Sequence, residues 1–157
     1  MKAKLVLNDC RVALAWAEDA ETEQEFRVRW VAVVALLRAV GHVLDKVDTM
    51  SSPHLSAAIK EKWKEWQANR EDNQIFWKFI EAERNNILKQ YEAGYEAGDI
   101  TVVVEGAGAP ESFLLGDALY KPLKSDGPYE GEDARDVAQE AISWWERQLS
   151  AIESGKI

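Results

Sequence analysis

Residues 73–91 read NQIFWKFIEAERNNILKQY, and two Glu-Ala-Gly triplets on either side of Tyr95 continue this stretch to Gly98. A helix advances about 100° per residue, and at that spacing the large apolar side chains fall on one face, as in a helix packed on a core. These side chains are Ile75, Phe76, Phe79, Ile80, Ile87 and Tyr91. The pattern predicts a long helix from Asn73 that ends at Gly98 or, one turn earlier, at Gly94, because glycine tolerates the left-handed conformation that follows a helix.

Glu83 falls inside this apolar face. A buried carboxylate is costly unless it is paired or hydrogen-bonded, so we expect a buried Glu83 that meets a cation from a neighbouring helix. Arg38 is the first choice, because Arg38 and His42, one turn apart, are the only ionisable residues between positions 30 and 44. Arg84 points about 100° away from Glu83 and is a poorer direct partner. The expected polar network comprises Glu83, Arg84, Asn85, Arg38 and His42.

Three helices are expected before this stretch. Asp9 is a fair N-cap for a first helix over about residues 9–20. Thr22 and Glu25 match a capping box for a second helix, which runs to about Val47 and is apolar on nearly all sides. Ser52 and Pro53 mark the start of a third helix. Its apolar face is about 90° out of phase with that of residues 73–91, which predicts a break between Gln67 and Asn73.

After Gly98 the pattern changes. Residues 100–104 are rich in β-branched side chains and residues 113–115 lie beyond a Gly-Pro turn, which predicts a short hairpin. Residues 116–131 read as an irregular loop, and Asp133 is a fair N-cap for the last helix. The sequence therefore predicts an all-α, up-and-down bundle of four or five helices. A short β-hairpin is inserted before the last helix, in one domain over residues 1–157 with hairpin and loop at about 99–131.

Composition narrows the function classes. The chain has 157 residues, a formal net charge of −9 and a pI near 4.8, so repulsion from phosphate disfavours nucleic acid as a partner. The longest apolar run ends at Arg38, well short of the ~20 residues that span a bilayer, and no signal peptide is visible. Cys10 is the only cysteine, which suits a reducing compartment. We expect a cytoplasmic protein without membrane contact.

No metal centre or cofactor is expected. His42 and His54 are the only histidines. His54 stands beside Pro53 at a helix start and His42 lies within an apolar helix, so nothing in the sequence brings them together as ligands. A core or interface histidine is the simpler interpretation of His42.

The stretch from Phe79 to Tyr91 resembles the signature helix of HEPN-like helical-bundle proteins, many of which are ribonucleases of defence and toxin–antitoxin systems. The signature of that superfamily is an Arg followed by a polar residue and, further along the same helix, a His, often with a Tyr nearby. Arg84, Asn85 and Tyr91 match it. The positions where the His would stand hold Lys89, Gln90 and Tyr91, so the catalytic His is absent.

We therefore expect a non-catalytic, HEPN-like interaction protein that forms a homodimer or binds a protein partner through helix faces, and the resemblance implies a link to defence or toxin–antitoxin systems. The seven tryptophans and the nearly all-apolar second helix motivate this expectation. One alternative is a degenerate, metal-independent ribonuclease in which Arg84 and Lys89 stabilise phosphate charge and Tyr91 assists. An amine with a pKa of about 10.4 is protonated at neutral pH and cannot replace the His as a general base. The other alternative is a purely structural bundle, in which Glu83 and Arg84 form a buried pair.

Overall fold

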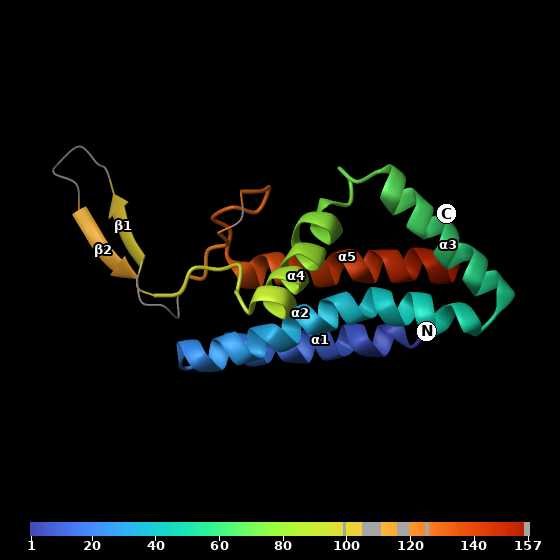
Figure 1. Ribbon diagram of the computed structural model, residues 1–157, viewed down its shortest axis with the longest axis horizontal. Coiled ribbons are helices and arrows are strands. Elements are labelled where there is room, and N and C mark those ends of the chain that lie inside the picture. The colour runs from blue at the N-terminus through green and yellow to red at the C-terminus, as the bar shows by residue number, and fades with distance from the viewer. Residues whose placement is uncertain (99, 105–110, 116–119, 125, 156–157) are drawn as a thin grey trace.

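The described part of the chain contains five α-helices and one antiparallel hairpin (Figure 1). The computed structural model describes residues 1–157 except 99, 105–110, 116–119, 125 and 156–157. In chain order the elements are α1 (Ala3–Glu18), α2 (Glu23–Lys46), the 3₁₀ turn η1 (Asp48–Met50), α3 (Pro53–Ala68), the π-helical segment η2 (Ile75–Ile80), α4 (Glu81–Gln90), β1 (Ile100–Val104), β2 (Glu111–Leu115) and α5 (Ala134–Ser154).

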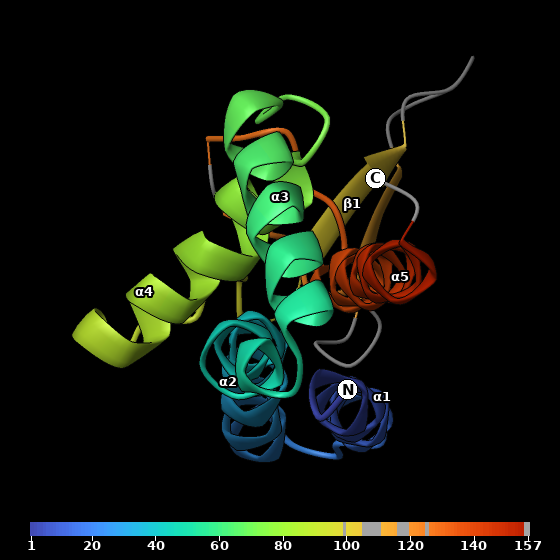
Figure 2. The same ribbon diagram turned by 90° about the vertical axis from the view of Figure 1, so that its right-hand side faces the viewer.

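The helices α1, α2 and α5 run side by side, and Figure 2 shows all three nearly end on. The helices α3 and α4 cross them at an angle, and the hairpin extends away from one end of the bundle (Figure 1). The predicted all-α bundle with a hairpin before the last helix is confirmed.

The predicted starts of α2 and α3 are confirmed by their caps. The Thr22 side chain accepts the amide of Glu25 at 3.2 Å, and the Ser52 side chain accepts the amide of Leu55 at 3.1 Å. The second half of the capping box differs, because the Glu25 carboxylate accepts the amide of Glu21 at 3.1 Å rather than that of Thr22. The predicted break is also confirmed, since α3 ends at Ala68 and the next helical element, η2, begins at Ile75.

The first helix begins at Ala3, six residues before the predicted cap at Asp9. Its cap comes from a distant part of the chain. The buried Asp48 carboxylate accepts the amides of Lys2 at 2.7 Å and Ala3 at 2.9 Å. These amides would otherwise lack partners, because the first turn of a helix has no preceding carbonyls to bond.

The long helix predicted from Asn73 is shorter than expected. Its first part is the π-helix η2, and α4 then ends at Gln90, with Tyr91 in the left-handed conformation at φ 55°. Neither Gly94 nor Gly98 ends the helix. Five of the six predicted face residues are buried, but Tyr91 is 67% exposed because it lies beyond the end of α4.

The hairpin and the last helix match their predicted places. β1 and β2 pair antiparallel, with Ile100 opposite Leu115 and Val104 opposite Glu111, and the turn between them lies outside the described residues. Asp133 caps α5 by accepting the amide of Arg135 at 2.9 Å. The tryptophans of α5, Trp144 and Trp145, are buried in the core.

Candidate functional site

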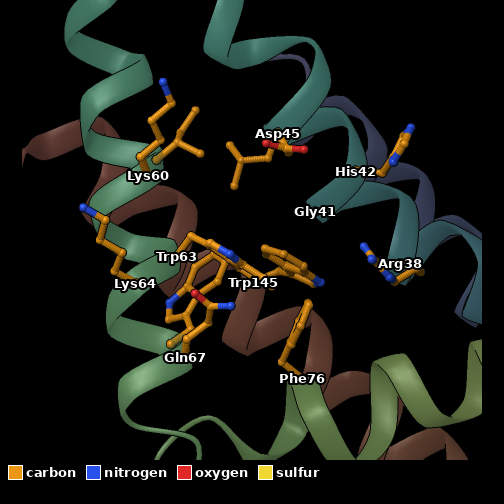
Figure 3. A pocket seen from close by; sticks show the side chains of 13 residues that line it. Arg38, Gly41, His42, Asp45, Lys60, Trp63, Lys64, Gln67, Phe76 and Trp145 are labelled. Atoms are coloured by element: carbon orange, nitrogen blue, oxygen red, sulfur yellow. The ribbon is translucent and has the colours of Figure 1, made fainter.

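A pocket of about 480 Å³ opens between α2 and α3 (Figure 3). Each helix contributes a row of polar residues at positions i, i+4 and i+7, a spacing that places side chains on one helix face. The α2 row is Arg38, His42 and Asp45, and the α3 row is Lys60, Lys64 and Gln67. The sequence predicted that Arg38 and His42 share a face, and both line this pocket.

Aromatic side chains form the floor of the pocket. They are Trp63 and Trp66 of α3, Phe76 of η2 and Trp145 of α5. The Trp145 indole N–H donates to the carbonyl of Leu37 at 3.0 Å, which fixes the ring against α2. A Cβ at Gly41 would lie 2.9 Å from Cη2 of Trp145, so glycine is the residue that lets the ring approach the α2 backbone.

The rim of the pocket is cationic. Arg38, Lys60 and Lys64 surround it, against the single carboxylate of Asp45. Within the described residues none of these three cations forms an ion pair, whereas Asp45 pairs with Lys46 at 2.8 Å. The Arg38 guanidinium lies over the Phe76 ring, 5.9 Å from its centroid. A positive patch in a chain of net charge −9 marks a surface suited to an anion.

Glu83 is buried, as predicted, with 4% of its surface exposed. Its predicted partner is wrong. The carboxylate accepts the backbone amide of Gly94 at 3.2 Å and the Trp30 indole N–H at 3.4 Å, while Arg38 lies over Phe76 instead. The chain after α4 returns over Glu83 so closely that a Cβ at Gly94 would lie 1.7 Å from a carboxylate oxygen.

Burial raises the pKa of the Glu83 carboxyl, because the charged form loses its hydration. The hydrogen bonds from Gly94 and Trp30 favour the charged form and act in the opposite direction, but burial outweighs them. With neutral donors in place of a cation, Glu83 acts as a structural group that joins α4, α2 and the segment after α4.

A second buried polar cluster was not foreseen. Lys121, only 3% exposed, donates to the Glu23 carboxylate at 2.7 Å, and the Tyr95 hydroxyl donates to the same carboxylate at 2.8 Å. The Lys121 ammonium also lies 4.9 Å from the centroid of the Phe26 ring. Lys121 belongs to an irregular segment without periodicity, so no sequence signal placed it against the start of α2.

The polar residues of α4 that match the HEPN signature lie apart from these clusters. Arg84 donates to the Asn85 side chain at 2.9 Å, and both are half-buried. Lys89 and Tyr91 are exposed. In the described ranges no hydrogen bond or ion pair joins Arg84 to Lys89 or Tyr91, and none joins Arg84 or Asn85 to Glu83, Arg38 or His42.

Comparison with protein-family models, curated proteins and solved structures found no match. The HEPN-like resemblance thus stays a prediction that rests on the residues of one helix.

The buried thiol of Cys10 has its pKa raised to about 12, chiefly by burial, so it stays protonated at neutral pH and is a poor nucleophile. In the part of the chain that the structure describes, no group of three or more His, Cys, Asp or Glu side chains is arranged to hold a metal ion. Among the helices that the structure describes, none combines the length and apolarity needed to cross a membrane.

The outer face of α1 carries an exposed apolar stripe. Leu5, Val12 and Trp16 are 62%, 56% and 63% exposed, and their spacing of seven and four residues places them on one side of the helix. The exposed Asp9 stands at the edge of the same side, between Leu5 and Val12 in sequence. The opposite side of α1 is buried through Leu7, Cys10 and other small or apolar residues.

Proposed function

We propose that this protein is a non-catalytic helical-bundle interaction protein, HEPN-like in form, that forms a homodimer through the outer face of α1. The observation that supports this proposal is the exposed stripe of Leu5, Val12 and Trp16. Apolar side chains that gather on an exposed face are typical of interaction surfaces, and large aromatic residues often supply most of the binding energy.

The charges of α1 favour a second copy of this chain as the occupant. Lys2 stands at the start of the helix, and Glu18 and Asp19 stand at its end. Two α1 helices packed antiparallel with Leu5 opposite Trp16 place Lys2 of one copy opposite Asp19 of the other. Such a contact is isologous, as in most homodimers, and it buries the apolar stripe of both copies at once.

Sedimentation velocity of a stripe variant tests the proposal. Val12→Glu with Trp16→Glu places charges on both sides of the contact, so we expect the wild type to sediment as a dimer and this variant as a monomer. Val47→Glu with Met50→Glu is the matched control, because both residues are exposed and apolar, lie off the stripe and give the same change in net charge. A monomeric wild type at high concentration, or equal loss of the dimer in both variants, would contradict the proposal.

The link to defence or toxin–antitoxin systems is part of the same proposal and is supported by the match of Arg84, Asn85 and Tyr91 to the HEPN signature. Genome neighbourhood tests it independently of the dimer. We expect an adjacent gene for a nucleotidyltransferase or a toxin-like protein, and unrelated neighbours across many genomes would count against the link.

A further inference from the structure

We propose that the pocket between α2 and α3 binds a small organic anion with an aromatic body, whose rings lie on the tryptophan floor and whose acidic group lies beside Arg38. This site is separate from the outer face of α1 and does not depend on the proposed dimer. Its volume of about 480 Å³ falls within the range of about 300–1,000 Å³ that is usual for small-molecule sites.

The floor supplies flat apolar surface. Trp63 and Phe76 meet edge to face with ring centroids 5.8 Å apart, and the pocket reaches Trp66 and Trp145 beside them. Aromatic ligands gain from offset stacking or edge contacts with such rings in addition to the apolar area they bury. A body with two or more fused or linked rings suits this surface better than a flexible chain does, because it loses less conformational freedom on binding.

The floor is also held in place without a ligand. Trp145 is fixed by its hydrogen bond to Leu37 and by its close approach to Gly41. Trp66 donates its indole N–H to the Gln148 side chain at 2.9 Å. Since these rings are anchored by neighbours on α2 and α5, a ligand meets a preformed surface and the reorganisation cost of binding is small.

The charged residues at the rim of the pocket favour a ligand that carries a negatively charged group. Figure 3 shows the Arg38 guanidinium directed toward Phe76 and Trp145, whereas the Lys64 ammonium points away from these rings. Asp45 pairs with Lys46, and Arg38 is the rim cation whose charged group lies over an aromatic ring of the floor. A carboxylate, sulfonate or phosphate beside Arg38 would accept charge-assisted hydrogen bonds from its guanidinium.

A matched pair of dyes tests both parts of this inference. 8-Anilinonaphthalene-1-sulfonate carries two aromatic groups and one sulfonate, and N-phenyl-1-naphthylamine is the same molecule without the sulfonate. We expect the wild type to bind the sulfonate at least about tenfold more tightly than the neutral dye in fluorescence titrations, as expected for charged hydrogen bonds. Arg38→Gln should remove most of this difference and leave the affinity for the neutral dye nearly unchanged.

The control variant carries Arg147→Gln, which changes the net charge equally at an exposed residue that does not line the pocket. It should bind both dyes as the wild type does. Indole N–H resonances of ¹⁵N-labelled protein locate the dye: those of Trp66 and Trp145 should shift on addition of the sulfonate, and that of the exposed Trp16 should not. Absence of binding, equal affinity for the two dyes, equal loss in both variants, or a shift confined to Trp16 would each overturn the inference.

Discussion

Glu83 carries a carboxyl group that binds its proton more tightly in the folded protein than in the unfolded chain, because burial raises its pKa above the ordinary value of 4.5. Its stabilising contribution is therefore fully present below pH 4.5 and is lost as the pH rises through the folded-state pKa. Glutamine keeps an acceptor for the Gly94 and Trp30 N–H groups and has no proton to lose. We predict that Glu83→Gln gains stability relative to the wild type as the pH rises above about 4.5.

Denaturant unfolding at a series of pH values measures this difference directly. Glu83→Ala serves as the comparison, because it leaves the two buried donors unpaired at a cost of about 1–3 kcal/mol each and should be the less stable variant at every pH. Parallel stability curves for Glu83→Gln and the wild type would show that the carboxyl keeps an ordinary pKa.

Gly94 is the residue that makes room for this carboxyl. A methyl group at position 94 would lie 1.7 Å from a Glu83 oxygen, so Gly94→Ala must displace either Glu83 or the chain segment above it. We predict a loss of about 1–3 kcal/mol in the free energy of unfolding, as is usual for overpacking. In a Glu83→Ala background the same change should cost much less, since the obstructing carboxylate is gone. Additive losses in this double-mutant cycle would argue against the contact.

At the scale of elements, the start of α1 depends on Asp48. This carboxylate accepts two amides of the first turn from 45 or more residues away in sequence. We predict that Asp48→Ala lowers the free energy of unfolding by about 1–2 kcal/mol, the usual cost of removing a helix cap, and speeds hydrogen exchange at Ala3. Asp45→Ala, which removes an exposed carboxylate from the same region, should have little effect. Equal melting of the two variants would mean that the cap is not needed.

The same contact shows why the sequence predicted some elements well and others badly. Thr22, Ser52 and Asp133 cap helices through residues two or three positions ahead, so their sequence neighbours predicted the starts of α2, α3 and α5 correctly. The start of α1 depends on a tertiary contact and was missed. The end of α4 was missed for the same reason, because Gly94 lies over Glu83 and does not terminate the helix.

The candidate pocket was foreseen only in part. Helical spacing placed Arg38 and His42 on one face, but the facing row on α3 belongs to another helix, and the separation of α2 from α3 cannot be read from periodicity. The buried Glu83 followed from its phase within the apolar face. Its partners did not, because an indole N–H and a backbone amide carry no charge that a search for cations would find.

At the scale of the whole molecule, the hairpin and the bundle are joined through a short ladder. Tyr95 pairs with Leu123, the Glu96 amide donates to the Pro122 carbonyl at 2.8 Å, and the Lys124 amide donates to the Gly94 carbonyl at 2.7 Å. These bonds bring the two ends of the hairpin segment together at the bundle. We predict that replacing residues 99–119 by a short Gly-Ser linker changes the melting temperature of the helices by only a few degrees, about the effect of 1 kcal/mol or less.

Calorimetry of the shortened chain checks this expectation. Tyr95→Ala in the full chain is the opposite case, because it keeps the hairpin but removes a buried ring that packs edge to face on Phe26, 5.0 Å between centroids. Its melting temperature should fall markedly. A shortened chain that no longer unfolds in one cooperative transition would show that the bundle needs the hairpin.

The position of α5 has a consequence for synthesis on the ribosome. This helix contacts α1, α2, α3 and η2, yet it is translated after all of them. Until Trp144 and Trp145 emerge, the aromatic rings of Trp66 and Phe76 have no partner on that side, so the nascent chain carries exposed apolar surface while the residues between Phe76 and Trp144 are translated. A nascent chain of this kind is a natural client for chaperones, and a product truncated before Trp144 is destined for aggregation or proteolysis.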